Sequence, residues 1–344
     1  MTQTAPQDKD ITARYHAIMA HCRRYNGADT ARSLRILVFN FAVFFALLAV
    51  IYHAHFIWGI LFLLPAAFML VRIFIMQHDC GHGSFFKSKR ANDAVGRFIS
   101  LFTFAPYGYW GREHDVHHAY VGQIDRQDIG YIDILTADDY AARSFLQKLL
   151  YRLYRHPLVL LVAGVPLHNI VLLRVPPLSR AKWDDRHFLS FADAWKSVMG
   201  HNAALLVFWG GLGYVFGFGA VCVVYLPVLV LGWQIGGWMF YVHHHFEDAY
   251  WQGGDDWHPH AARLYASSYY KLPDFWHWAT GYIGLHQIHH FSSGIPHYKL
   301  ADCIRALPEL QDMNPVTFRE SLRSIWLAII DPTRRKMIRL SDLG

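Results

Sequence analysis

Residues 34–76 read LRILVFNFAVFFALLAVIYHAHFIWGILFLLPAAFMLVRIFIM, and QHDCGH follows directly at 77–82. A helix needs about 20 mostly apolar residues to cross a bilayer. The stretch therefore predicts two spans joined by a turn of only three residues, His53 to His55. A later apolar stretch predicts a second pair, with its turn at Gly217 to Gly219. The four predicted spans are 34–52, 56–76, 201–218 and 220–242.

The composition of the 344-residue chain agrees with a membrane protein. Hydrophobic residues make up 53% of it and charged residues only 17%, whereas globular domains average about a quarter charged residues. Such a composition excludes a disordered chain, a coiled coil and a nucleic-acid-binding tail. The net charge of +6 is explained by basic loops at a membrane surface, so we expect no nucleic-acid partner. The four cysteines are scattered and form no CxxC pair, which indicates reduced thiols.

The basic residues orient the predicted spans. Of the 32 Lys and Arg, 6 lie in residues 1–35, 15 in 77–199 and 10 in 243–344, and the short turns hold none. The positive-inside rule then predicts that both termini and the long middle segment are cytoplasmic. The first residues have no apolar core or cleavage site of a signal peptide. We therefore expect a cytoplasmic N-terminal segment at 1–33, a membrane domain at 34–305 and a cytoplasmic C-terminal tail at 306–344. The fold class expected is an all-α integral membrane protein, with two helical hairpins and a cytoplasmic helical cap.

One further apolar segment does not fit a span. Residues 145–175 mix Arg152, Arg155 and Arg174 with leucines and valines. This pattern is typical of a helix that lies in the membrane interface.

The histidines carry most of the functional information. The chain has 23 of them, nearly as many as the 26 Asp and Glu together. Residues at positions i, i+3 and i+4 of a helix share one face, so the spacing within each cluster lets several imidazoles project together. The predicted topology places all the clusters on one side of the membrane. The four clusters are HDCGH at 78–82, HDVHH at 114–118, HHHFED at 243–248 and HQIHH at 286–290.

Metal binding explains these clusters better than solvated histidines do. An imidazole at the end of a span is costly to desolvate unless it is paired or bound to a metal. Imidazole suits Zn, Cu, Fe and Ni, and about nine candidate ligands are twice what one metal needs. Soluble di-iron bundles use Glu and ExxH motifs instead, which this chain lacks. The sequence therefore predicts two metal ions held almost entirely by imidazoles.

HDCGH, HDVHH and HQIHH, in this order, resemble the three histidine boxes of the membrane fatty acid desaturase family. His114 lies 32 positions after His82 and His286 lies 168 positions after His118, which fits that family's layout. Residues 117–140 also resemble the corresponding segment of acyl-lipid desaturases of the Δ12 type, and the bacterial enzymes of this type are the nearest match. Residues 240–251 and 286–300 resemble the family's segments after the last span and around the third box. The resemblance covers about residues 35–305.

The resemblance implies a membrane enzyme with a di-iron centre. It implies that O2 and two electrons are used to insert a cis double bond into a fatty acyl chain of a membrane lipid, in a bacterial inner membrane. Eight ligands come from the boxes, and a ninth follows the last span. His244 aligns with the ninth, although the neighbouring His243 and His245 leave the register open. The implied ligands are His78, His82, His114, His117, His118, His244, His286, His289 and His290.

The chain shows no GxGxxG, no CxxCxxC and no HPGG motif. We therefore expect a separate electron donor, a ferredoxin or a cytochrome b5-like protein with its reductase. The acyl chain is expected among apolar spans near Trp110, Trp233 and Trp238. Carboxylates beside metal-bound imidazoles commonly orient them. The candidates for this role are Asp79, Glu113, Asp115, Glu247 and Asp248.

Two alternatives remain open at this point. A hydroxylase or ketolase of the same histidine-box superfamily, acting on a lipid or carotenoid, would share the boxes. A histidine-rich membrane metal transporter or sensor belongs to a different class, and it would be expected to carry polar residues within the spans. The sequence leaves the oligomeric state unknown.

Overall fold

Four long apolar helices form the frame of the computed structural model. Each of the four is long and apolar enough to cross a membrane, which confirms the predicted all-α membrane fold. The structure describes residues 8–54, 56–126, 132–178 and 188–343. Residues 1–7 of the expected N-terminal segment and 127–131 of the segment at 117–140 lie outside these ranges. The four helices are α2 (Thr30–His53), α3 (Phe56–Gly81), α9 (Phe191–Phe216) and α10 (Phe218–His244).

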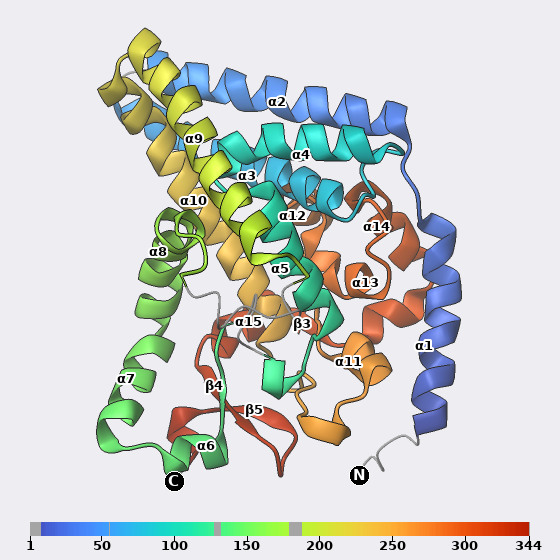
Figure 1. The fold of residues 1–344 in the computed structure, drawn as a ribbon. Coiled ribbons are helices and arrows are strands. Elements are labelled where there is room, and N and C mark those ends of the chain that lie inside the picture. Colours follow the sequence, from blue (N-terminus) through green and yellow to red (C-terminus); the bar gives the residue numbers. More distant parts are fainter. Residues whose placement is uncertain (1–7, 55, 127–131, 179–187, 344) are drawn as a thin grey trace.

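The turns of the two hairpins lie side by side. The rings of Tyr52 at the end of α2 and Phe216 at the end of α9 have centroids 6.3 Å apart, and Figure 1 shows both turns at the upper left. The opposite ends of α3 and α10, which carry histidines, therefore point to the same side of the molecule. α9 begins at Phe191 rather than at 201, because the Ser190 side chain caps the helix by accepting from the Asp193 N–H.

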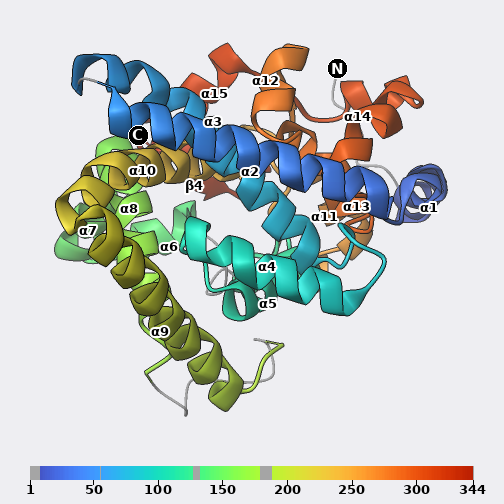
Figure 2. The same cartoon turned by 90° about the horizontal axis from the view of Figure 1, so that it is seen from above.

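α3 is the central helix of the frame. It packs against α2, α10 and the amphipathic helix α4 (Lys89–Thr103), and Figure 2 shows α2 crossing over α3 with α4 alongside. Buried side chains fill the space between these helices. Among them are Phe41 and Phe44 of α2, Ile73 and Met76 of α3, Phe102 of α4 and Leu229 of α10.

A short connection brings α5 (Tyr107–Ala119) against the last turn of α3. The Gln77 side chain donates to the Ala105 carbonyl over 3.1 Å and accepts from the Thr103 hydroxyl over 2.6 Å. The Tyr107 hydroxyl donates to the Cys80 carbonyl over 2.9 Å. The second histidine box, on α5, is thereby fixed beside the first.

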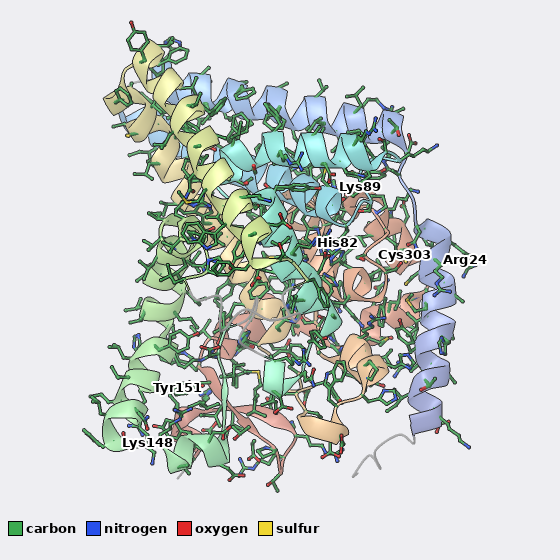
Figure 3. The ribbon with its side chains drawn as sticks, in the orientation of Figure 1. Arg24, His82, Lys89, Lys148, Tyr151 and Cys303 are labelled. Atoms are coloured by element: carbon green, nitrogen blue, oxygen red, sulfur yellow. The ribbon has the colours of Figure 1, made fainter. Side chains whose placement is uncertain are left out.

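The segment expected in the membrane interface is a bent pair of helices. α7 (Phe145–Arg155) is followed by a π-helical segment (Leu158–Gly164) and α8 (Val165–Ile170), and the axis bends by 57°. Leucines of α7 such as Leu149 are exposed, whereas Tyr151 faces inward in Figure 3. Length and composition allow this pair as a fifth span, and its place in the interface stays a prediction.

Two small sheets complete the end of the molecule that carries the histidines. β1 (Leu135–Thr136) pairs in parallel with β4 (Leu327–Asp331), which pairs antiparallel with β5 (Lys336–Arg339). β2 (Tyr269–Lys271) pairs in parallel with β3 (Pro315–Thr317). The sequence analysis treated residues 306–344 as a tail. Their described part instead contains α15 (Phe318–Ser324) and three strands, two of which pair with earlier parts of the chain.

The remaining helices are short, apart from α1, and surround the same end. Figure 1 shows α1 running along its outer side. These helices are α1 (Asp8–Cys22), α6 (Ala137–Ala142), α11 (Pro259–Tyr265), α12 (Asp274–Ala279), α13 (His286–Phe291) and α14 (His297–Arg305).

We expect Gly96→Ala to destabilise the protein by about 1–3 kcal/mol, as overpacking of a tight contact does. A Cβ atom at Gly96 of α4 would overlap the ring of Tyr107, whose hydroxyl holds the last turn of α3. Thermal unfolding in detergent measures the effect. Gly200→Ala is the control, because a Cβ there meets nothing within 4 Å. Equal melting temperatures of the two variants would contradict the role given to this contact.

Candidate metal centre

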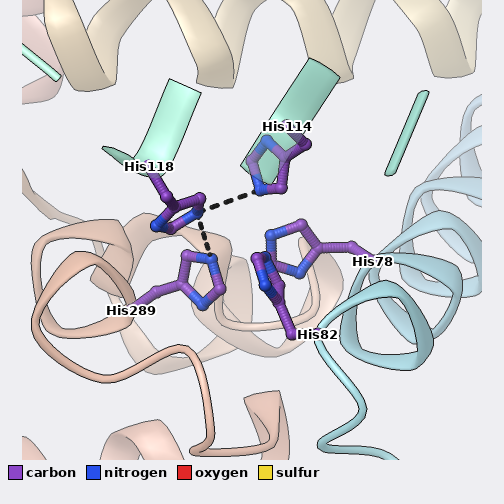
Figure 4. Close-up of side chains that lie close together, drawn as sticks. All are labelled: His78, His82, His114, His118 and His289. Atoms are coloured by element: carbon purple, nitrogen blue, oxygen red, sulfur yellow. Dashed lines mark hydrogen bonds between the residues drawn. The ribbon is translucent and has the colours of Figure 1, made fainter. Parts of the chain in front are cut away.

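The structure brings the nine predicted histidines together in two groups. Within each group, each histidine offers one ring nitrogen, and these nitrogens all lie within 4.8 Å of one another. Figure 4 shows the first group, whose rings come from three separate parts of the chain. The first group is His78, His82, His114, His118 and His289, and the second is His117, His244, His286 and His290.

The box on α5 contributes to both groups. His114 and His118 are one turn apart and share a face, which points to the first group. His117 is offset around the helix and belongs to the second group. α5 therefore lies where the two groups meet.

The box on α13 divides in the opposite sense. His286 and His290 share a face and belong to the second group, whereas His289 belongs to the first. Each HxxHH box thus gives two imidazoles to one group and one to the other. The spacing of the boxes alone did not reveal this reciprocal division, because it depends on how the two helices face each other.

The closest ring nitrogens are all Nε2 atoms. His118 Nε2 lies 3.1 Å from His114 Nε2 and 2.9 Å from His289 Nε2, as the dashed lines in Figure 4 mark. In the second group the pairs His117–His244 and His286–His290 are 3.1 and 3.0 Å apart. Two nitrogens each about 2.1 Å from one ion, at a right angle, are about 3.0 Å apart. The spacing fits ligands that share a metal ion.

Burial favours the neutral form of the box histidines that lie outside the spans. It lowers the pKa of His82 to about 3, and the charge of a neighbouring histidine, His78, adds to the effect. The same two causes hold the pKa values of the other box histidines outside the spans well below the ordinary range; they are His114, His117, His118, His286, His289 and His290. A neutral imidazole offers a lone pair to a metal. Both groups contain only histidine, and this donor set suits Fe, Cu, Zn or Ni.

Carboxylates lie beside two of the rings in the first group. Asp79 Oδ2 accepts from the backbone N–H of His297 over 2.8 Å and lies 2.7 Å from His297 Nδ1. The other oxygen of Asp79 is 3.5 Å from His78 Nδ1. Asp115 lies 3.9 Å from His82 Nδ1 and accepts from Arg112 over 2.7 Å. A hydrogen bond to a carboxylate fixes the orientation of a metal-binding imidazole, and of these two pairs Asp79 and His78 are within hydrogen-bond distance.

The geometry distinguishes among the three consecutive histidines at the end of α10. His244 Nδ1 lies 3.0 Å from the Ala266 carbonyl oxygen, which turns its Nε2 towards His117. His245 Nδ1 lies 3.1 Å from the Tyr241 carbonyl, and its ring stacks on the ring of Tyr241. His243 stacks on His286 at a centroid distance of 4.6 Å. Only His244 of the three belongs to either group in the described part of the chain.

Two of the candidate carboxylates point elsewhere. Lys336 Nζ lies 2.9 Å from Glu247 Oε1 and 3.1 Å from Asp248 Oδ1, and both acidic side chains are exposed. The lysine lies on β5, a strand that the sequence analysis did not indicate. The expectation that Glu247 and Asp248 orient the imidazoles is therefore not met.

Aromatic rings cover the histidines. Trp110 stacks on His114 with centroids 5.0 Å apart. Trp233 instead donates to the Thr103 carbonyl, and Trp238 to the Tyr270 hydroxyl. The sequence analysis missed Phe240, whose ring lies 5.5 Å from the rings of both His117 and His244. Phe240 lies one turn before His244 on α10, and this spacing could have indicated that the two side chains share a face.

A hollow of about 230 Å³ reaches both groups from the outer surface. His118 of the first group and His290 of the second line it, and their rings stack 4.2 Å apart. The other lining residues are Met19, Arg263 and the run from Phe291 to Gly294.

Comparison with known proteins agrees with this geometry. The chain is 32% identical to a fatty acid desaturase of Bacillus subtilis, over 90% of this chain and 86% of the relative. It is 30% identical to a ferredoxin-type sn-1 acyl-lipid omega-3 desaturase of Synechocystis, over 74% and 68%. An endoplasmic-reticulum acyl-lipid omega-3 desaturase (cytochrome b5) of Arabidopsis thaliana is 27% identical over 76% and 66%. The family model for fatty acid desaturases matches residues 55–321. The chain therefore belongs to the fatty acid desaturase family.

Proposed function

We propose that this protein is a di-iron desaturase that uses O2 and two electrons to insert a cis double bond into an acyl chain of a membrane lipid. The observation that carries the proposal is the convergence of nine histidines, with no carboxylate among them, into two adjacent groups. Family membership supports oxidation of a fatty acyl chain. The acyl-lipid names of the Synechocystis and Arabidopsis relatives support a lipid-bound substrate.

Two bound iron ions would supply the oxidising power from O2 that unactivated C–H bonds require. The chain's own residues hold and shield the site. His78, His82, His114, His118 and His289 would hold one ion, and His117, His244, His286 and His290 the other. Asp79 keeps the ring of His78 in place. The apolar rings of Trp110 and Phe240 lie against the imidazoles and exclude water from the side where an acyl chain would pass.

We propose that both termini and the histidine groups lie on the cytoplasmic side of the membrane, which is the inner membrane in bacteria. The distribution of Lys and Arg supports this orientation. The transporter alternative is weakened because the histidine groups lie where α3 and α10 end rather than along the spans. A hydroxylase or ketolase would differ in its product, which makes product analysis the decisive experiment.

The fatty-acid profile of a heterologous host expressing this chain tests the reaction. We expect new unsaturated chains, which disappear in the His117→Ala, His118→Ala double variant because each group loses one imidazole. Gas chromatography with mass spectrometry identifies the products and the position of the double bond. Hydroxylated or ketonic chains instead would favour the alternative oxidases. An unchanged profile together with bound zinc and no iron would contradict the oxidase proposal.

The identity of the ninth ligand is tested by comparing His244→Ala with His245→Ala. We expect His244→Ala to lose at least half of the bound iron, since its Nε2 faces the second group. His245→Ala should keep the iron of the unmodified protein, because its ring is directed at Tyr241. Metal analysis of monodisperse purified protein measures both. The reverse ranking would assign the ninth ligand to His245.

Electrons come, in this proposal, from a separate protein. The names of two relatives mention ferredoxin and cytochrome b5. We infer that the donor approaches the hollow lined by His118 and His290, because it connects the surface to both histidine groups. Arg263 in its wall favours an acidic partner.

Filling the hollow should slow electron transfer from a protein donor but not from a small chemical reductant. Ser293→Trp places a large ring in the wall of the hollow, and we expect product formation driven by ferredoxin to fall at least tenfold. Reduction by dithionite, a small molecule, should continue close to the unmodified rate. A single-turnover assay with each reductant measures the two rates. Equal losses with both reductants would show that the substitution damages the site itself.

A further inference from the structure

A second cavity lies between α2, α3 and α12, and none of the nine histidines lines it. We propose that this cavity binds the phosphate group of a membrane phospholipid. The proposal is independent of the reaction assigned above, since it concerns a different set of residues.

The cavity has a cationic side and an apolar side. Its volume is about 330 Å³, and Arg32, Arg35 and Arg72 line it together with Asn40. Ile36, Phe39 and Trp278 form the apolar remainder of the wall. No carboxylate belongs to the lining among the described residues. Three guanidinium groups around one cavity are well matched to phosphate, which accepts several of their hydrogen bonds at once.

Arg72 is the strongest sign that a negative group is missing. It lies within the apolar helix α3 and is only 6% exposed. Its Nε donates to Asn40 Oδ1 over 2.7 Å, its Nη1 donates to the Trp278 carbonyl, and its guanidinium lies over the Trp278 ring. All of these partners are neutral, and no ion pair of Arg72 occurs in the described part of the chain. A buried charge in a span is costly without a counter-charge, which an anionic ligand would supply.

Arg32 and Arg35 add two cations at the mouth of the cavity. Both lie in the first two turns of α2, where the helix dipole also favours an anion. Arg32 donates to the Tyr298 carbonyl over 2.9 Å, and Arg35 is exposed. Asp29 is the acidic neighbour, and its carboxylate is occupied as the N-cap of α2, accepting from the Arg32 N–H. The local charge is therefore positive.

The surroundings indicate a lipid rather than a free phosphate ion. Beyond Arg35, α2 continues as an apolar span, and Phe39 is 50% exposed. α12 presents the exposed aromatic side chains Phe275 and Trp276, and the Trp276 ring packs on Phe68 of α3. Tryptophans concentrate where headgroups meet the hydrocarbon region. The cavity thus combines a phosphate-binding side with an apolar wall for the first carbons of a lipid tail.

Native mass spectrometry of the detergent-purified protein with added phosphatidylglycerol tests the proposal. We expect one tightly held phosphatidylglycerol, and at least tenfold weaker binding by the Arg32→Gln, Arg35→Gln variant. Lys87→Gln, Arg90→Gln is the matched control, because it removes the same charge from exposed positions before and at the start of α4. The control should bind as the unmodified protein does. Thermal unfolding of each variant confirms that it is folded.

Three comparisons separate the lipid from other occupants. Diacylglycerol, which lacks phosphate, should bind much more weakly than phosphatidylglycerol. Inorganic phosphate at the same concentration should not displace the lipid, and Phe39→Ala should weaken lipid binding by removing part of the apolar wall. Equal binding of phosphatidylglycerol by the arginine variant and the control would overturn the proposal. Displacement by inorganic phosphate would do so as well, since it would identify a site for a free anion.

Discussion

The structure depends on one requirement: nine imidazole rings, buried or half-buried, meet beside the ends of two apolar helices, and their nitrogens need partners. Burial in a low-dielectric interior makes an unsatisfied polar group expensive. Seven of the rings direct their Nε2 atoms towards one another, whereas Nε2 of His78 and of His82 is buried without a hydrogen-bond partner among the described residues. The rings come from the ends of α3 and α10 and from α5 and α13. The frame of spanning helices holds these four helices in fixed positions relative to one another.

Contacts outside the two groups hold that arrangement. The Ala266 carbonyl that orients His244 belongs to a loop that the Asn314 side chain clamps by donating to Leu264 and Ser267 carbonyls. Asn314 lies directly before β3, and β3 pairs with β2. The C-terminal strands therefore act on the orientation of a ring on α10, although they are distant from it in sequence.

Much of this arrangement could be predicted from the sequence, and the rest was inaccessible for physical reasons. Hydropathy revealed the four spans, and the spacing within the boxes indicated which histidines project together. The division of each HxxHH box between two groups required the relative rotation of α5 and α13, which no local pattern encodes. The short parallel strands pair with partners that are distant in sequence, such as β1 with β4. Their sequences therefore lack the tight turn that reveals a hairpin. The ion pair of Glu247 with Lys336 on β5 was equally hidden, because it also joins segments that are distant in sequence.

The reciprocal division of the boxes has a consequence for how such chains can change in length. One inserted residue within HDVHH would rotate the following histidines by about 100° around the helix, so that rings aimed at both groups would miss them together. Loops that contact neither group face no such restriction, since they only have to return the chain to the next helix. Insertions and deletions should therefore accumulate in the connecting segments and be absent from the boxes. The geometry of two helices, rather than the chemistry of any single ring, sets the permitted spacing.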